Sequence, residues 1–115
     1  MQIEIAEDSQ SVTRVALTGR LDTAGVDAVE TRFNAALGAG GSGLVDMSGV
    51  EFLSSMGIRM LVGAAKVVAR RGGRLVLVAP RELVAEALHH SAVDDILPVA
   101  ADLDAGRALL AADAD

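Results

Sequence analysis

The most informative stretch of the chain reads Leu44-Val45-Asp46-Met47-Ser48-Gly49-Val50-Glu51-Phe52-Leu53-Ser54-Ser55-Met56-Gly57-Ile58. The apolar run that begins at Leu44 is typical of a buried strand, and Gly49 predicts a short loop after it. A helical pattern then covers residues 56–70. Ser54 and Ser55 therefore stand where helix N-caps are preferred, because a serine oxygen there can accept a hydrogen bond from a free backbone N–H. A phosphate on either serine would face the positive end of the helix dipole, which also makes the pair a candidate switch.

The rest of the chain alternates strands and helices after an opening hairpin. Besides the strand at Leu44, the pattern predicts strands over 2–5, 12–18, 74–78 and 96–99 and helices over 23–37, 56–70, 81–89 and 102–112. The turn at residues 8–11 is short enough for an antiparallel hairpin. The continuous apolar run 75–78 predicts a central strand, and Pro98 predicts an edge strand. We expect one α/β domain over residues 1–115, with a mixed, mostly parallel sheet of about five strands and about four helices.

The composition excludes several classes of protein. The chain has a formal net charge of −6 and a single lysine, Lys66, so it lacks the clustered basic surface of a nucleic-acid binder. It has no Trp or Tyr to stack on bases and no cysteine for disulfides or thiolate metal sites. The N-terminus does not resemble a signal peptide, and no apolar run is long enough to span a membrane. We therefore expect a soluble cytoplasmic protein without membrane insertion.

Two local patterns point to no cofactor and no catalysis. The segment Gly38-Ala39-Gly40-Gly41-Ser42-Gly43 has the spacing of a dinucleotide fingerprint, but a helix precedes it and a strand follows it. The fingerprint requires the reverse order, so we interpret the segment as a flexible linker. His89 and His90 are adjacent on a helix and do not form an i, i+4 metal pair. A nucleophile elbow and a phosphate-binding loop are also absent, so the sequence predicts a protein that is not an enzyme and holds no metal or cofactor.

The helix over 56–70 has two apolar faces. One holds Ile58, Leu61, Val62, Ala65, Val68 and Ala69 and should face the sheet, and the opposite face holds Met56, Met60, Gly63 and Val67. Arg59, Lys66 and Arg70 flank the second face. A surface helix is normally polar opposite its core face. The second face is therefore either covered by another element of the domain or a partner-binding surface with adaptable methionines and a basic rim.

The same stretch resembles the signature of the STAS domains, and in particular of bacterial anti-anti-sigma factors. The matching residues are Asp46-Met47-Ser48 and Phe52-Leu53-Ser54-Ser55-Met56-Gly57, with a further match at Leu17-Thr18-Gly19-Arg20-Leu21-Asp22. Residues 83–99 resemble the C-terminal helix and last strand of the family. Ser54 stands where many members have Asp, and Ala92 stands where Gly is usual.

The resemblance implies an anti-sigma factor antagonist that works by partner switching. In the family, the serine two positions before the glycine is phosphorylated, which corresponds to Ser55 here, with Ser54 as a second hydroxyl. The unphosphorylated form binds an anti-sigma factor serine kinase of the histidine-kinase-type ATPase class and releases that kinase's client. Phosphorylation breaks the complex, and a metal-dependent serine phosphatase restores it. The expected partner-binding residues are Asp22, Asp46, Ser54, Ser55, Met56, Gly57, Arg59, Met60, Gly63 and Val67.

Asp22 and Asp46 have two possible roles. They either flank the serines and orient the hydroxyl, or they make caps and turns. Two other functions stay open. One is a STAS-type accessory subunit bound permanently to a membrane transporter ATPase, in which the apolar face is a fixed interface. The other is a small α/β enzyme, which would need convergent acid–base residues in a pocket.

Overall fold

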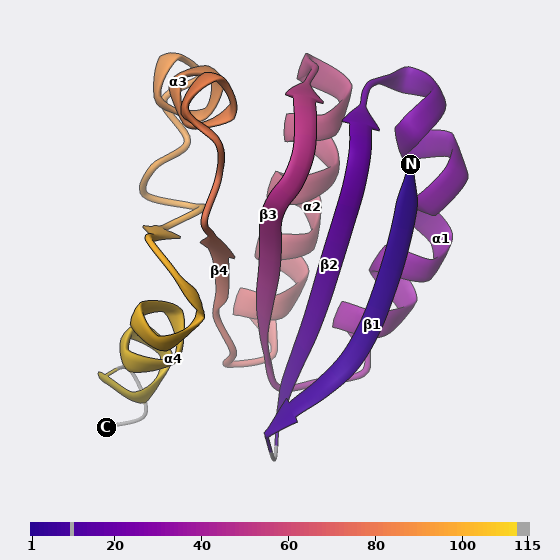
Figure 1. Cartoon of the computed structure of the whole chain (residues 1–115). Coiled ribbons are helices and arrows are strands. Elements are labelled where there is room, and N and C mark those ends of the chain that lie inside the picture. The colour runs from indigo at the N-terminus through magenta and orange to yellow at the C-terminus, as the bar shows by residue number, and fades with distance from the viewer. Residues whose placement is uncertain (10, 113–115) are drawn as a thin grey trace.

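A computed structural model of the chain describes residues 1–9 and 11–112 (Figure 1). The strands are β1 (Gln2–Ser9), β2 (Val12–Leu21), β3 (Ser42–Leu53), β4 (Leu75–Val78) and β5 (Val99–Ala100). The helices are α1 (Thr23–Gly38), α2 (Ser55–Arg70), α3 (Glu82–His90) and α4 (Leu103–Ala112). The predicted α/β class and the order of elements are confirmed. Gln10 in the predicted hairpin turn and residues 113–115 of the predicted domain lie outside the described residues.

The five strands form one mixed sheet in the order β1-β2-β3-β4-β5. β1 and β2 pair antiparallel, and the remaining neighbours pair parallel. β5 is an edge strand, as Pro98 predicts, but it begins only at Val99. Ile96 and Leu97 lie in a turn before it, where the backbone N–H of each donates to the carbonyl of Val93, at 3.0 and 2.8 Å.

Helices cover both faces of the sheet at β4, which explains why that strand is apolar throughout. Leu75 and Leu77 belong to the larger core, which includes buried side chains of α1, α2 and α3. Val76 and Val78 point the other way, into a smaller cluster with α4. Figure 1 shows α1 and α2 side by side behind β1, β2 and β3. Alternation of side chains along a strand thus assigns each helix to a face.

The loop predicted after Leu44 is absent, because β3 runs without interruption to Leu53. Its register with β2 shifts twice, between Ala16 and Thr18 and between Gly19 and Arg20. A β-bulge breaks the period of two along a strand, so a run with bulges does not show the alternation by which strands are recognised. Gly49, which we interpreted as a loop residue, is a packing residue: a Cβ there would lie 2.9 Å from the Leu17 carbonyl oxygen.

The glycine-rich segment is also less flexible than predicted. It does connect a helix to a strand, but Ser42 and Gly43 already belong to β3. A Cβ on Gly43 would lie 2.6 Å from Leu37 and 2.8 Å from Leu75, so a larger residue has no room. Gly41 has a φ of +77° and packs against the Ser11 carbonyl. Two of these glycines are therefore required by close packing at the amino end of β3.

The C-terminal helix α4 is held to the far side of the sheet by an ion pair. Arg107 donates two hydrogen bonds to Asp8 of β1, at 2.9 and 2.8 Å. The Asp8 side chain is only 4% exposed, and Arg14 lies 3.6 Å from it. The hydrogen bonds from Arg107 hold the pKa of the Asp8 carboxyl below its usual value. None of the helices in the described part of the chain is long and apolar enough to span a membrane.

Candidate functional site

The serine pair lies at the carboxyl end of β3, where Ser54 is the single residue between that strand and α2. The Ser54 oxygen accepts a hydrogen bond from the backbone N–H of Gly57 at 3.2 Å. Its hydroxyl donates to the carbonyl of Leu21 at 3.0 Å. Ser54 is therefore the N-cap of α2 and also ties the helix to the end of β2. The predicted position of the cap is confirmed for this serine.

Ser55 has a different environment, although it is the next residue. It is the first residue of α2 and is exposed. Within residues 1–9 and 11–112, its hydroxyl has no recorded hydrogen-bond partner. The first turn of α2 also contains no acidic side chain. An anion on this hydroxyl would meet the positive end of the helix dipole, with no acidic residue of that turn to repel it.

Gly57 is a packing residue of the same turn. It is buried, and a Cβ at this position would lie 2.6 Å from the Leu21 carbonyl oxygen and 2.8 Å from the side chains of Leu21 and Leu53. Any larger residue would push α2 away from the ends of β2 and β3. Gly57, which we expected to contact a partner, therefore sets the position of Ser55 from beneath the helix.

Sequence reasoning missed Arg20 and singled out Phe52 only as part of the signature. The two residues face each other on the paired ends of β2 and β3. The Arg20 guanidinium lies 4.4 Å from the centre of the Phe52 ring, which is 40% exposed. Arg20 also lies 3.5 Å from the Asp22 carboxylate. A charged and aromatic patch thus lies two residues before Ser54, where neighbouring parallel strands end.

Asp22 belongs to this edge, but Asp46 does not. Asp22 caps α1 by accepting from the backbone N–H of Gly25 at 2.9 Å, which is the main reason that its pKa is lowered. Asp46 lies in β3 opposite Val78 and accepts from the backbone N–H of Ser48 at 3.0 Å. It is eight residues before Ser54, or about 25 Å along an extended strand. The expectation that Asp46 flanks the serines is wrong, and its role is the local backbone one.

The second apolar face of α2 is partly covered. Met56 and Val67 are 39% and 38% exposed, and Gly63 is also exposed. Met60 is only 4% exposed, so of the two alternatives for this face the first one, cover by another element of the domain, holds for Met60. The physical reason is α1, which packs beside α2 and leaves a groove of about 330 Å³ between the two helices. On the opposite side of α2, Ala69 is exposed and does not reach the sheet.

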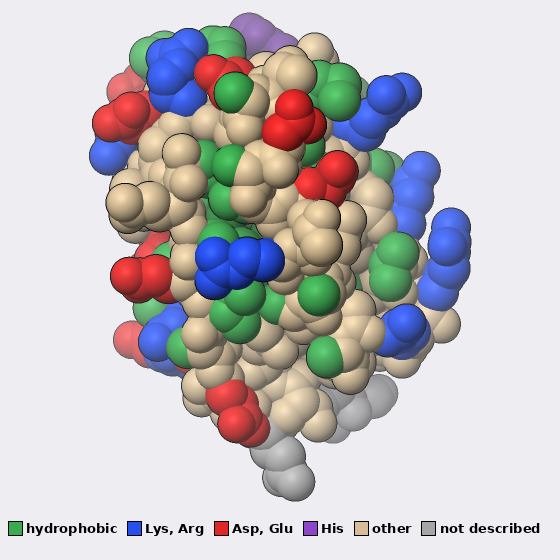
Figure 2. All heavy atoms as spheres, turned by 90° about the vertical axis from the view of Figure 1, so that its right-hand side faces the viewer, with side chains coloured by type: hydrophobic (Ala, Val, Ile, Leu, Met, Phe, Trp, Pro, Cys, Tyr) green, Lys and Arg blue, Asp and Glu red, His purple; other side chains and the backbone are tan. Residues whose placement is uncertain are grey.

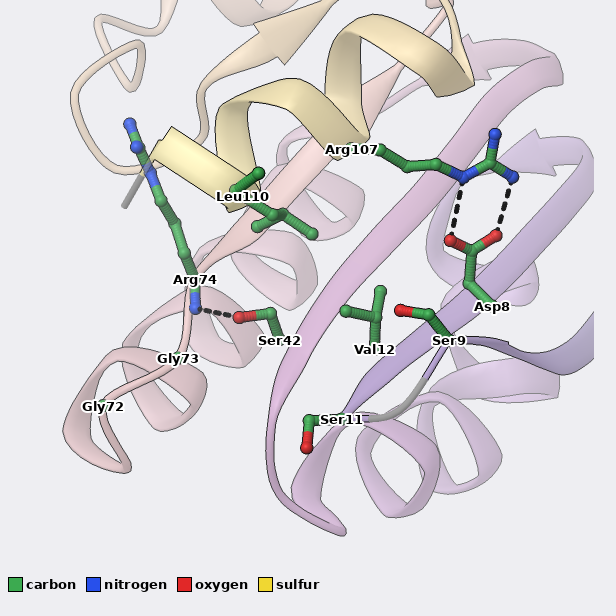
Figure 3. Close-up of a pocket in the computed structure, with 11 residues that line it drawn as sticks. Asp8, Ser9, Ser11, Val12, Ser42, Gly72, Gly73, Arg74, Arg107 and Leu110 are labelled. Atoms are coloured by element: carbon green, nitrogen blue, oxygen red, sulfur yellow. Dashed lines mark hydrogen bonds and ion pairs between the residues drawn. The ribbon is translucent and has the colours of Figure 1, made fainter. Parts of the chain in front are cut away.

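A larger cavity, of about 690 Å³, lies at the other end of the sheet. Figure 3 shows the ion pair between Arg107 and Asp8 at one side of it and Ser42, bonded to the backbone N–H of Arg74, at the other. Among the residues that the structure describes, no group of three His, Cys, Asp or Glu side chains could hold a metal ion. Neither Ser54 nor Ser55 lines this cavity.

Comparison with known proteins identifies the family to which this fold belongs. A family model of the STAS domain matches residues 4–106. None of the curated proteins searched matches the sequence. A solved anti-sigma factor antagonist from Mycobacterium paratuberculosis is 23% identical, with 96% of this chain and 93% of that chain covered and a TM-score of 0.85. The unphosphorylated anti-sigma factor antagonist SpoIIAA is 17% identical, with 94% and 96% covered and a TM-score of 0.77.

The fold also occurs within a membrane protein. The murine anion transporter Slc26a9 is 22% identical over 89% of this chain, which covers 18% of the transporter, with a TM-score of 0.75. At such identities these structures establish the shared fold. Because the family model spans residues 4–106 and the sheet and helices follow the same arrangement, the chain belongs to the STAS domain family.

Proposed function

We propose that this chain is an anti-sigma factor antagonist whose binding to its partner is switched off by phosphorylation of Ser55. The observation that carries the proposal is the difference between the two adjacent serines. Ser54 uses its hydroxyl to cap α2 and to bond Leu21, whereas the Ser55 hydroxyl is exposed. Only Ser55 can therefore be modified without breaking a hydrogen bond that supports the fold.

The surroundings of Ser55 suit a protein interface. Phe52 and Met56, on either side of the serine pair, are 40% and 39% exposed. Exposed aromatic and methionine side chains are enriched at the centres of protein interfaces. We assign the complementary surface to an anti-sigma factor serine kinase of the histidine-kinase-type ATPase class. In this proposal the unphosphorylated chain occupies the kinase and frees its client, and a metal-dependent serine phosphatase reverses the modification.

The proposed switch acts through local charge. A phosphoserine carries about −1.5 to −2 charges at neutral pH. At the first residue of α2 that charge interacts favourably with the helix dipole, so the helix should remain folded. In the complex, however, the same charge would have to lose its water beside Phe52 and Met56. The partner would therefore dissociate while the domain keeps its structure. The chain itself needs no catalytic group in this scheme.

The test is phosphorylation by the cognate kinase and ATP, with mass mapping and affinity measured on the same samples. We expect one phosphate, located on Ser55, and a large loss of kinase affinity. Ser55→Ala should accept no phosphate and bind the kinase constitutively. Ser54→Ala, the matched control, should still be modified at Ser55. Phosphate that persists in Ser55→Ala and disappears in Ser54→Ala would move the site to Ser54.

The transporter-subunit function is the second candidate, because the same fold occurs within the anion transporter Slc26a9. A subunit bound permanently to a transporter ATPase would use the same surface without a switch. Equal kinase affinity for the unmodified and the fully phosphorylated chain, measured by calorimetry at one salt concentration, would support this alternative over partner switching.

A further inference from the structure

The groove between α1 and α2 begins at Arg59, one helical turn after Ser55, and Gly63 leaves open space within it. Met60, Gly63 and Val67 line it on the α2 side, and Glu30, Asn34 and Leu37 line it on the α1 side. A Cβ built on Gly63 would meet no heavy atom within 4 Å. Glycine within a helix costs roughly 0.5–1 kcal/mol relative to alanine. Packing within the domain therefore does not require glycine at position 63. The absence of a side chain there leaves open space in the groove.

A row of positive charge lies between this groove and Ser55. α2 contains Arg59, Lys66 and Arg70 and no acidic residue, although the chain as a whole has a net charge of −6. At 100° per residue, Ser55 and these three side chains fall within about 60° of one another on the helix. Met56, Met60, Gly63 and Val67 occupy the adjacent arc of about 60°. The basic row and the apolar groove are therefore parallel neighbours on one helix face.

These cations, Arg59, Lys66 and Arg70, have no ion-pair partner in the part of the chain that the structure describes. In Figure 2, Lys and Arg side chains gather along the right-hand side of the molecule, which is the side of the helix layer. Of the residues described, one acidic side chain, Glu30, lines the groove against these three cations, so the charge on its α2 side attracts an acidic surface and would repel a basic one.

We propose that the groove binds an acidic amphipathic segment of the anti-sigma partner, which inserts one apolar side chain over Gly63 and places its carboxylates against Arg59, Lys66 and Arg70. Helices commonly bind grooves of this kind through a few apolar side chains, with charged residues at the rim. This inference rests on the proposed function, because it assigns the chemistry of the same partner. It adds α1 as the second wall of the binding surface.

The arrangement also connects the groove to the switch. Ser55 and Arg59 are separated by four residues, and side chains at this spacing are neighbours on a helix. Because helical side chains lean toward the N-terminus, the Arg59 side chain is long enough to reach a phosphate on Ser55. A phosphate on Ser55 would therefore pair with Arg59 and repel the carboxylates of the bound segment. Phosphorylation would release the partner by competing for the first cation of the row.

Gly63→Leu provides a direct test, because a Cβ at this position meets no heavy atom within 4 Å and the rest of the side chain would occupy the groove. Ala69→Leu is the matched control, since Ala69 is exposed on the same helix but outside the groove. We expect both variants to be at least as stable as the wild type in urea denaturation. By calorimetry with the purified kinase, Gly63→Leu should lose at least about tenfold in affinity, and Ala69→Leu should bind as the wild type does. Wild-type affinity for Gly63→Leu would overturn the proposal.

A charge reversal tests the acidic character of the segment. Lys66→Glu combined with Arg70→Glu should weaken kinase binding and flatten its dependence on salt. Arg32→Glu, on the exposed face of α1, should change neither. If the reversal leaves the affinity and its salt dependence unchanged, the segment is not acidic and the proposal fails. If phosphorylation of the wild type leaves its kinase affinity unchanged, the proposed function itself fails. Failure of the acidic-segment proposal and failure of the proposed function can therefore be distinguished.

Discussion

Arg20 lies against the face of Phe52, with its guanidinium carbon 4.4 Å from the centre of the ring. The two side chains stand at paired positions on neighbouring parallel strands, immediately before Ser54. Asp22, 3.5 Å from Arg20, holds the guanidinium from the other side. The aromatic ring at the edge of the candidate interface is therefore in contact with a cation.

This contact should be measurable as a coupling energy. A double-mutant cycle with Arg20→Gln and Phe52→Leu is expected to give about 0.5–1 kcal/mol in the free energy of unfolding, the range for exposed cation–π pairs. Phe52→Leu keeps an apolar side chain at the surface, so any loss of kinase binding beyond that of Arg20→Gln reports on the ring itself. A coupling energy indistinguishable from zero would mean that the two side chains are neighbours without a stabilising interaction.

The two serines should differ in their effect on stability. Ser54→Ala removes the cap of α2 and the hydrogen bond to Leu21, and we expect a loss of about 1–2 kcal/mol in the free energy of unfolding. Ser55→Ala removes a hydroxyl that supports no contact, so the change should stay within about 0.5 kcal/mol. Urea denaturation of the two variants checks this. Equal losses would show that Ser55 also supports the helix.

Local signals in the sequence predicted the fold well where they were complete. The N-cap serine, the continuous apolar run of β4 and the proline before β5 each follow from short-range physics. β3 was misjudged because its bulges depend on the register with β2, which no window of β3 contains. The sequence left two roles open for Asp46, and only its position within β3 decides for the local one.

The candidate site was predictable only in part. The local pattern placed Ser54 and Ser55 correctly at the start of α2, and the helical wheel found the second apolar face of this helix. The wheel cannot tell which residues of that face a neighbouring helix covers, so the burial of Met60 by α1 was missed. Nothing in the sequence indicated a role for Arg20, because its contact with Phe52 depends on the pairing of β2 with β3.

The ion pair between Asp8 and Arg107 predicts a specific dependence on pH. The pKa of Asp8 is lower in the folded chain than its ordinary value of about 3.9, chiefly through the hydrogen bonds from Arg107. A depressed pKa contributes stability above the unfolded value and loses it as the pH falls through the folded one. Asp8→Asn should therefore be less stable than the wild type at neutral pH, and the difference should shrink below about pH 4.

Denaturant titrations between neutral and acid pH measure this difference. Asp104→Asn is the control, because Asp104 also accepts from Arg107 but its side chain is 93% exposed. It should affect stability little at any pH. A difference between wild type and Asp8→Asn that does not vary with pH would show that the carboxylate charge is not what fixes α4.

Ala92, which stands where the STAS resemblance implies glycine, should store backbone strain. It follows the end of α3 with a φ of +55°, and its N–H donates to the carbonyl of His89 at 3.1 Å. An L-residue with a side chain is disfavoured in this left-handed conformation by about 1 kcal/mol or more. Ala92→Gly is therefore expected to raise the free energy of unfolding by up to about 1 kcal/mol. Ala85→Gly, within α3, should lower it, and a loss in both variants would rule out strain at Ala92.

Two residues on the same wall of the groove, Met60 and Val67, should respond differently to an introduced charge. Met60→Asp places a carboxylate where α1 and α2 pack together, at a position that is 4% exposed, and the nearby Glu30 would add repulsion. We expect it to lose at least about 3 kcal/mol of stability, since the charge has no partner there. Val67→Asp lies on the same face but is 38% exposed, so its loss should stay below about 1 kcal/mol. Thermal and urea denaturation compare the two variants directly.

A well-folded Met60→Asp would mean that α1 can move away from α2. The groove would then be wider and more adaptable than the structure shows. If Val67→Asp folds normally but binds the kinase poorly, its defect can be assigned to the interface, which Met60→Asp cannot establish.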